Sequence, residues 1–215
     1  MRNNAIFYLS INWEKRGKLM KFELNKLVMI AISGALAFII MLFEFALPIF
    51  PPFLRLDFSD IPALLVGFAA GPLTGLAVVA IRNMLHLTIT ATMGIGELAN
   101  FLISGSLVFS ASFFFKKWDS TRISLILASV IMVISALVVN LLIVIPLYEA
   151  ILDLPLKETI EAARQVNPWV RGLNSYLALV IGPFNLLKAA SVSLLFLPIY
   201  KRLESTSIYK KYQGS

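Results

Sequence analysis

The chain of 215 residues is 59% hydrophobic and only 14% charged, and its mean hydropathy is +0.83. Soluble domains carry about 25% charged and roughly 45–50% apolar residues, so this chain has too few polar side chains for a water-exposed surface. Its net charge of +7 comes from basic residues that lie between apolar blocks rather than on one nucleic-acid-binding face, and it has no cysteine for disulfides or thiolate metal sites. The composition therefore indicates an integral membrane protein.

Six apolar segments follow one another and are predicted to be helices, because lipid offers no partner to unpaired backbone groups. They cover residues 24–47, 59–70, 73–91, 96–115, 120–147 and 172–200. A hydrocarbon core about 30 Å thick needs roughly 20 helical residues, and only the second segment is clearly short. We predict an all-α integral membrane protein, with a bundle of six transmembrane helices in residues 24–203. A basic arm of residues 1–23 precedes the bundle, and a tail of residues 204–215 follows it.

Prolines and polar residues set the expected helix boundaries. Three prolines should end the first segment, because proline lacks an amide donor and clashes with the preceding turn. These are Pro48, Pro51 and Pro52. Ser59 or Asp60 can cap the second helix. Residues 148–171 are expected to form a long loop that contains a short surface helix at residues 154–164.

The distribution of lysine and arginine predicts the orientation. With the N-terminus in the cytosol, thirteen of these residues lie on the cytosolic side of the predicted spans and four on the outer side. Positive charge is concentrated in cytosolic loops of membrane proteins. We therefore expect a multi-pass protein of the cell membrane with both termini in the cytosol.

Polar residues inside the predicted spans are few, and such residues usually mark a function or a compensating partner. The ionisable ones are Glu44, Arg82, His86, Glu97 and Lys188, and the amides are Asn83, Asn100, Asn140 and Asn185. Most of them lie toward the outer side, where Asp57 and Asp60 flank the mouth. Together they predict a polar pocket that opens to the outside.

The sixth segment is the most informative. Pro183 stands as a helix breaker before Asn185 and Lys188, which share a face at i, i+3. Lys188 lies about 20 Å from the cytosolic end of the segment, too far for its side chain to reach that surface. It needs a ligand acceptor, depressed ionisation, or a carboxylate partner such as Glu97 or Glu44. We favour ligand contact because Asn185 lies beside it.

Signatures of enzymes are absent from the sequence. It contains no H-E-x-x-H, G-x-S-x-G or G-x-x-x-x-G-K-[ST] motif, and one histidine cannot supply a two-histidine zinc site. We expect Arg82 to pair with a carboxylate and His86 to be a satisfied interior histidine. We therefore predict that the chain is not an enzyme, and we assign no catalytic or metal-binding residue. Two rival hypotheses remain: an intramembrane enzyme that uses His86 and Glu97, and a structural or sensory membrane subunit.

The first segment carries small residues at a spacing that lets helices approach closely in lipid. Ala31 and Ala35 stand four residues apart on one helix face. By spacing alone, this pattern fits internal packing and an intermolecular surface equally well.

With these residues in view, the chain resembles the substrate-binding (S) components of energy-coupling factor (ECF) transporters, and in particular their riboflavin-specific type. The resemblance covers about residues 22–200. It is carried by residues 53–64 (FLRLDFSDIPAL), 71–75 (GPLTG), 96–101 (GELANF) and 182–188 (GPFNLLK). The last of these motifs points to riboflavin.

The resemblance implies a fold and a binding site. It implies six helices with both termini cytosolic, a first outer loop that acts as a lid, and a ligand pocket near the outer face. It also implies that the N-x-x-K pair of the sixth helix binds the flavin. The implied ligand-binding residues are Asn185, Lys188, Asn140, Asp57 or Asp60, Glu97 and Asn100.

The resemblance also implies a function and partners. The expected function is high-affinity capture of riboflavin from outside the cell, for an ATP-driven importer whose partner subunits hydrolyse the ATP. Riboflavin, and FMN if it is accepted, would be a transported ligand rather than a resident cofactor. Ala31 and Ala35 would dock on a transmembrane coupling (T) subunit that carries two cytosolic ATPases. The alternative within the same class is an S component for another vitamin or precursor.

Overall fold

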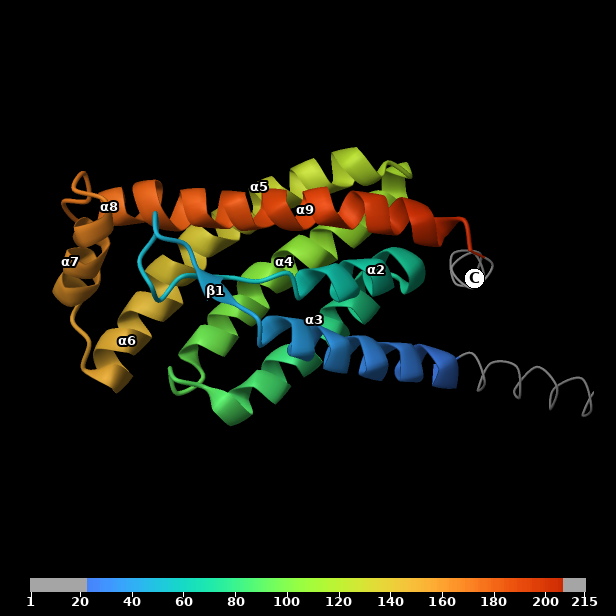
Figure 1. Ribbon diagram of the computed structural model, residues 1–215, viewed down its shortest axis with the longest axis horizontal. Coiled ribbons are helices and arrows are strands. Elements are labelled where there is room, and N and C mark those ends of the chain that lie inside the picture. The colour runs from blue at the N-terminus through green and yellow to red at the C-terminus, as the bar shows by residue number, and fades with distance from the viewer. Residues whose placement is uncertain (1–22, 207–215) are drawn as a thin grey trace, which may run out of the picture.

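The computed structural model describes residues 23–206, so nearly all of the predicted arm and most of the predicted tail lie outside the described residues. The described chain is largely helical (Figure 1). Its elements are the N-terminal helix Glu23–Met41, β1 (Phe45–Ala46), β2 (Arg55–Leu56), α2 (Asp60–Ala70), α3 (Pro72–His86), η1 (Leu87–Ile89), α4 (Ile95–Trp118), α5 (Thr121–Val139), η2 (Asn140–Val144), α6 (Ile145–Leu152), α7 (Leu156–Val166), α8 (Leu173–Tyr176), η3 (Leu177–Ile181) and α9 (Gly182–Glu204).

Five helices of the described chain are long and apolar enough to cross a membrane. They are Glu23–Met41, Pro72–Ile89, Ile95–Trp118, Thr121–Leu152 and Leu173–Glu204. The other predicted span, α2, is an apolar helix of 11 residues. It lies between its neighbours α3, α4 and α9, and nine of its residues are buried, so protein rather than lipid surrounds most of its backbone.

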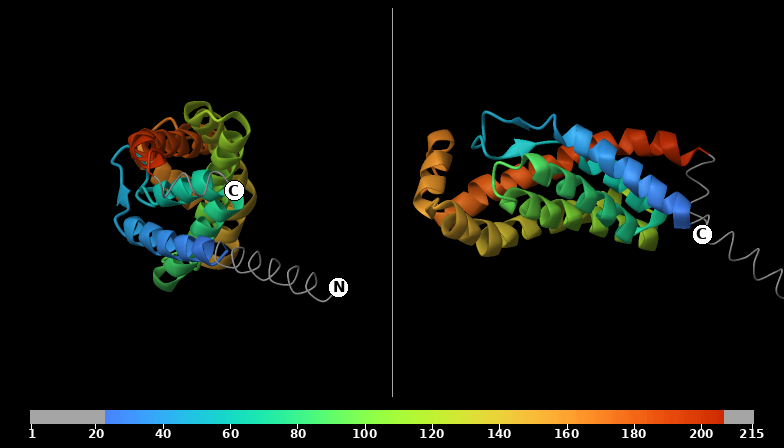
Figure 2. Two further views of the ribbon diagram at one scale, coloured as in Figure 1. Left: turned by 90° about the vertical axis from the view of Figure 1, so that its right-hand side faces the viewer. Right: turned by 90° about the horizontal axis from the view of Figure 1, so that it is seen from below.

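The long helices run roughly along the long axis of the molecule, as the views in Figures 1 and 2 show. The start of the N-terminal helix and the end of α9 lie at one end of the bundle, which we call the terminal end. The β1–β2 hairpin and α7 lie at the opposite end, which we call the hairpin end (Figure 1). The N-terminal helix packs along one side, and its Gly34 contacts Ile81 of α3 closely.

The first helix ends earlier than its prolines predict. It stops at Met41, and the amides of Phe43 and Glu44 then bond to carbonyls three residues back, which tightens the chain into a turn. The chain next enters β1, which pairs antiparallel with β2. The prediction that the helix runs to residue 47 was wrong, and Glu44 lies in a loop rather than inside a span. Hairpin pairing ends the helix before the prolines are reached.

The last long helix is continuous where the sequence predicts a break, and the helix before it is longer than predicted. A π-helical turn, η2 or η3, comes before the α-helix that contains Pro146 or Pro183 in its first turn. The π-helical turn changes the hydrogen-bond pattern just before the proline, so the helix continues although the proline lacks an N–H. The prediction of a break at Pro183 was therefore wrong, and the fifth helix reaches Leu152 instead of residue 147. The following loop contains α7, close to the predicted surface helix.

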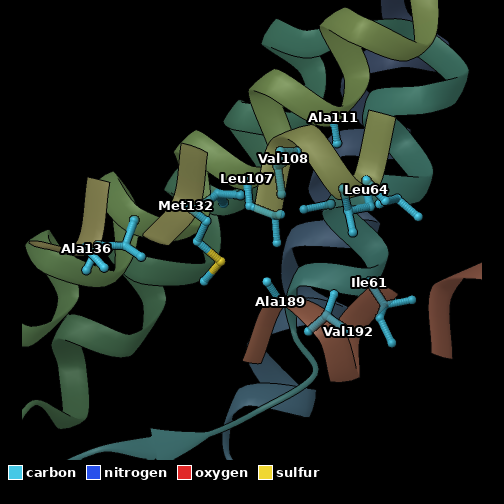
Figure 3. Close-up of a cluster of buried hydrophobic side chains, with 14 of the residues drawn as sticks. Ile61, Leu64, Leu107, Val108, Ala111, Met132, Ala136, Ala189 and Val192 are labelled. Atoms are coloured by element: carbon cyan, nitrogen blue, oxygen red, sulfur yellow. The ribbon is translucent and has the colours of Figure 1, made fainter. Parts of the chain in front are cut away.

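The core lies where α2, α4, α5 and α9 meet (Figure 3). Its labelled members are Ile61, Leu64, Leu107, Val108, Ala111, Met132, Ala136, Ala189 and Val192. Small residues allow α2 and α3 to approach closely. A Cβ atom on Gly75 would lie 2.9 Å from the Ala63 carbonyl oxygen and 2.9 Å from the Gly67 Cα. The two backbones therefore leave no room for a side chain at Gly75.

Aromatic side chains fill the bundle toward its terminal end. The ring of Phe68 stacks on Phe115 with 4.4 Å between centroids and meets Phe196 edge-on at 5.0 Å. Tyr200 contacts all three rings. This cluster closes the interior of the bundle between α2, α4 and α9.

Candidate ligand-binding site

A cavity of about 780 Å³ lies at the hairpin end of the bundle. Its walls come from the loop that carries β1 and β2, the α3–α4 turn, η2 and α6, α7, and the start of α9. Sites for small organic ligands usually measure about 300–1,000 Å³. The cavity is therefore large enough for a ligand of vitamin size.

The structure brings six of the seven predicted ligand-binding residues to the wall of this cavity. They are Asn185, Lys188, Asn140, Asp57, Glu97 and Asn100. Asp60 does not line it: its side chain is fully buried and pairs with Arg82 at 2.7 Å. Of the two first-loop aspartates, Asp57 alone faces the cavity, and the expected carboxylate partner of Arg82 is confirmed as Asp60.

Lys188 is paired within the protein and still borders the cavity. Its Nζ donates to Asp57 Oδ2 at 2.8 Å and to Asn100 Oδ1 at 3.4 Å. The partners considered from the sequence were wrong, because Glu97 bonds to His86 and Glu44 pairs with Arg55. An ammonium group carries three N–H donors, and two are used here. The third remains for a ligand.

The Asp57 carboxylate is buried as an anion. Burial by itself would raise its pKa, but the Lys188 ammonium, the Arg82 guanidinium and hydrogen bonds from Lys188 and Ser59 hold the pKa well below its ordinary value. The neighbouring cations therefore overcome the cost of removing the carboxylate from water. Lys188 and Asp57 together present a neutral pair to the cavity.

These side chains belong to a closed ring of polar contacts, most of them hydrogen bonds. Arg82 donates to Ser59 Oγ at 2.6 Å and to Asp60 Oδ1 at 2.7 Å, and Ser59 donates to Asp57. Ser104 Oγ lies 3.2 Å from Asp60 Oδ2 and 2.9 Å from Asn100 Oδ1, and its one hydrogen can be donated to only one of these two acceptors at a time. In order, the ring runs through Arg82, Asp60, Ser104, Asn100, Lys188, Asp57 and Ser59. It joins α3, α4 and α9 to the segment that leads into α2.

Two amides, one on η2 and one on α9, leave their side-chain oxygen atoms open to the cavity. Asn140 donates to the Ala136 carbonyl at 2.8 Å, and Asn185 donates to the Ile181 carbonyl at 2.9 Å. Within residues 23–206, neither side-chain oxygen accepts a hydrogen bond. One N–H of each amide is thus fixed on its own helix, while the oxygen and the second N–H can bind a ligand.

Glu97 forms the polar wall on the other side of the cavity. Its carboxylate lies 2.8 Å from His86 Nδ1, and it accepts hydrogen bonds from Thr90 at 2.8 Å and Thr92 at 3.2 Å. His86 therefore has a partner, as predicted. These four residues fix the turn between α3 and α4. The described residues contain no group of three or more His, Cys, Asp or Glu side chains that could hold a metal ion.

Apolar and aromatic residues that sequence reasoning did not assign to the site complete its walls. They include Phe53, Ile103, Val144, Tyr148, Tyr176 and Phe184. Nothing in the sequence separates these aromatic residues from the many that face outward. Glu158 and Thr159 of α7 also border the cavity, and no motif pointed to them.

The predicted docking residues lie away from the cavity. Ala31 and Ala35 are exposed on the N-terminal helix, while Gly34 and Ala37 of the same helix are buried against the bundle. Exposed Ile32 and several other large apolar side chains of this helix share the outer face. Ala31 and Ala35 therefore do not pack against the rest of the bundle.

The family model described as "ECF transporter, substrate-specific component" matches residues 25–200. The chain belongs to this family. It is 31% identical to the riboflavin transporter RibU of Staphylococcus aureus over 191 residues, which cover 87% of this chain and 95% of the relative. It is 30% identical to the riboflavin transporter FmnP of Bacillus subtilis, with coverage of 85% and 93%.

A solved structure titled as the S component of a bacterial ECF transporter superposes on this S component. The TM-score is 0.67 and the identity 29%, and the match covers 84% of this chain and 96% of that one. The predicted resemblance and the multi-pass membrane protein are thereby confirmed. The family consists of transporter components, not enzymes, so the rival hypothesis of catalysis by His86 and Glu97 is not supported.

Proposed function

We propose that this S component captures riboflavin in the cavity at the hairpin end, as the substrate-binding subunit of an ATP-driven vitamin importer. Its relatives in two species are riboflavin transporters, and its own cavity has the polar groups that a flavin needs. The observation that carries the proposal is the pair Asn185 and Lys188, which lie one helical turn apart on the cavity wall with an acceptor and a donor unused.

The chemistry of the flavin ring matches this pair. The pyrimidine edge of isoalloxazine presents an acceptor, a donor and an acceptor in sequence. The oxygen of Asn185 can accept from the ring N–H, while its second N–H and the third N–H of Lys188 can donate to the two carbonyls. Because Asp57 already balances the charge of Lys188, the wall suits an uncharged ring.

The rest of the cavity suits the remaining parts of riboflavin. Aromatic and aliphatic side chains such as Phe184 and Ile103 can cover the ring faces, and burial of apolar surface is worth about 25 cal/mol per Å². The open oxygen of Asn140 can accept a hydrogen bond from a ribityl hydroxyl. The bound hydroxyls would otherwise lose their hydrogen bonds to water.

The proposal includes a six-helix topology with the cavity facing outward. The basic residues of the α4–α5 turn and of the end of α9 lie at the terminal end, together with Lys26. Four other basic residues lie at the hairpin end: Arg55, Lys157, Arg164 and Arg171. The concentration of positive charge on the cytosolic side supports cytosolic termini and an outward cavity. In this topology the short helix α2, which packs against α3, α4 and α9, joins the five long helices and brings the number of helices to six.

The proposed partners are a transmembrane coupling subunit and two cytosolic ATPases, as the family description implies for a substrate-specific component. The exposed face around Ala31 and Ala35 is the proposed contact with the coupling subunit. Small residues on an unpacked face permit a close helix–helix approach in the membrane.

The test is a titration of purified protein with riboflavin, followed by quenching of flavin fluorescence. Lys188→Ala and Asn185→Ala should each weaken binding about tenfold or more, since each removes a hydrogen bond to the buried ring. Lys201→Ala, an exposed lysine near the far end of the same helix, is the matched control and should bind normally. Undiminished binding by both cavity variants would contradict the proposed site.

Competition distinguishes riboflavin from another vitamin. Thiamine, biotin and folate, each added in large excess, should leave the bound flavin in place, because none presents the same acceptor–donor–acceptor edge to Asn185 and Lys188. Displacement of riboflavin by one of them at a lower concentration would assign the chain to that vitamin instead.

A further inference from the structure

Arg82 is fully buried and does not line the cavity, yet it is bonded to the segment that pairs with Lys188. One of its terminal nitrogens, Nη1, donates both of the hydrogen bonds that its side chain makes within residues 23–206, to Ser59 at 2.6 Å and to Asp60 at 2.7 Å. Asp60 thus fixes the guanidinium, and the guanidinium reaches the Ser59 hydroxyl. Arg82 and Lys188 lie on different helices and are linked through Ser59 and Asp57.

The donors and acceptors in this series of hydrogen bonds can be assigned in only one way. A guanidinium is always a donor, so the Ser59 oxygen accepts from Arg82 and its single hydrogen is left to donate. That hydrogen goes to Asp57 Oδ1, which also accepts from the Ser59 amide at 2.9 Å. With Oδ1 occupied by two donors, Asp57 turns Oδ2 toward Lys188 at 2.8 Å.

The fixed carboxylate in turn fixes the ammonium group. Lys188 spends one N–H on Asp57 and one on Asn100, so the direction of the third N–H is determined by these two bonds. A flexible four-carbon side chain would otherwise hold its donors in many directions. The network thus converts a mobile cation into an oriented donor at the cavity wall.

We propose that Arg82 and Ser59 are positioning residues for riboflavin, which orient the Lys188 donor toward the flavin through Asp57 without touching the ligand. The inference rests on the proposed function. It also gives Asp60 a role as the anchor of Arg82, in place of the ligand contact expected from the sequence.

The test variant is Ser59→Ala, which removes the relay hydroxyl and changes no charge. Ser124→Ala is the matched control, because Ser124 is also a fully buried serine and its hydroxyl has no partner among the described residues. Two quantities are measured: the Kd for riboflavin, and the visible absorption spectrum of the flavin bound at saturation. The spectrum reports hydrogen bonding to the ring carbonyls, and Lys188→Ala supplies the shift that follows from loss of the Lys188 donor.

We expect Ser59→Ala to weaken binding about tenfold, in the range found for residues that act through a network, and to shift the bound-flavin spectrum in the same direction as Lys188→Ala. Ser124→Ala should change neither quantity. An unchanged Kd for Ser59→Ala would overturn the inference, and so would a weaker Kd with an unchanged spectrum. If Ser59→Ala cannot be purified, Arg82→Lys takes its place, since it keeps the cation beside Asp60 while its shorter side chain gives up Ser59.

The outcome also separates this inference from the proposed function. No riboflavin binding by the unaltered protein would overturn the proposed function and the positioning role with it. Normal binding by the unaltered protein, together with an unaffected Ser59→Ala variant, would overturn the positioning role alone.

Discussion

The two ends of the bundle are built from the same helices but packed in different ways. Toward the terminal end, α2, α4 and α9 enclose stacked aromatic rings, with Phe68 and Phe115 only 4.4 Å apart. Toward the hairpin end, the continuations of α4, α5 and α9 surround a cavity of about 780 Å³ with polar side chains on its wall. A tightly packed half holds the helices in place, which allows the other half to stay open without collapsing.

The helices also change geometry between the two ends. The π-helical turns η2 and η3 lie in contact with each other toward the hairpin end, each followed by a proline within the next α-helical turn. Such turns are rare and occur frequently at functional sites. Here η2 begins with Asn140 and η3 ends shortly before Asn185, and these are the two amides whose oxygen atoms remain open.

The largest effect is expected from filling the closest contact in the packed half. Gly75→Val would place side-chain atoms against the backbone of α2, where a Cβ already comes within 2.9 Å of Ala63 and Gly67. Backbone atoms cannot move aside as a side chain can, so α2 and α3 must separate. We expect little or no monodisperse protein after detergent extraction, measured by size-exclusion chromatography.

A glycine at the hairpin end is the matched control. A Cβ on Gly172 would meet nothing within 4 Å, and its extended backbone is open to any residue. Gly172→Ala should therefore give the yield and melting temperature of the unaltered protein. Equal yields of Gly75→Val and Gly172→Ala would show that the packed half is not what holds the bundle together.

The next largest effect is expected from removing the buried cation Arg82 of α3. Arg82→Leu leaves the carboxylates of Asp57 and Asp60 buried with Lys188 as the one remaining cation of the ring. Removing one partner of a buried ion pair typically costs about 3–5 kcal/mol. The melting temperature, followed by intrinsic fluorescence in detergent, should fall sharply.

A double variant tests the cause of that loss. Replacing Arg82 and Asp60 together by leucine removes both charges of the pair, and such replacements are often neutral in stability. The double variant should therefore melt above Arg82→Leu alone. If it melts lower, the loss comes from packing and not from an uncompensated carboxylate.

Much of the fold could be predicted from the sequence because lipid imposes a simple rule. A run of apolar residues long enough to cross the membrane must be helical, and five such helices are present in the described chain. The errors fell at proline. Pro48 was expected to end the first helix and Pro183 to break the last, but hairpin pairing decided the first case and a π-helical turn the second. The pairing of β1 with β2 leaves no local signal in the sequence, whereas a proline follows each of the two π-helical turns.

The site could be predicted as a set of residues but not as a network. Burying a polar side chain in the membrane costs free energy, so Lys188 and Asn185 stand out in the sequence by residue type and position alone. The partner of Lys188 is Asp57, 131 residues away along the chain, and no local pattern records that distance. The sequence therefore offered Glu97 and Glu44 as partners and could not separate Asp57 from Asp60. Ser59 can hydrogen-bond to both Arg82 and Asp57 only because α2 packs against α3.

A smaller effect is expected at the second open amide. Asn140→Leu removes the oxygen that faces the cavity and keeps a side chain of similar size on the same helix. Riboflavin binding should weaken about tenfold, which is the loss of one hydrogen bond of roughly 1–1.5 kcal/mol, while the melting temperature should hardly change. Ser129→Ala, which alters a polar residue of α5 away from the cavity, should leave the Kd unchanged. A lower melting temperature with an unchanged Kd would mean that Asn140 serves the fold instead.

The smallest effect is expected at Arg55, a paired arginine of the loop that carries β1 and β2. Arg55 lies 3.3 Å from Glu44 across the hairpin, and its side chain is 55% exposed. Exposed ion pairs contribute about 0–1 kcal/mol and are screened by salt, whereas the buried Arg82 pair is protected from solvent. Arg55→Gln should lower the melting temperature by no more than a few degrees, and high salt should produce a similar small change in the unaltered protein. A loss as large as that of Arg82→Leu would mean that the hairpin, and not the buried ring, carries the stability of the open half.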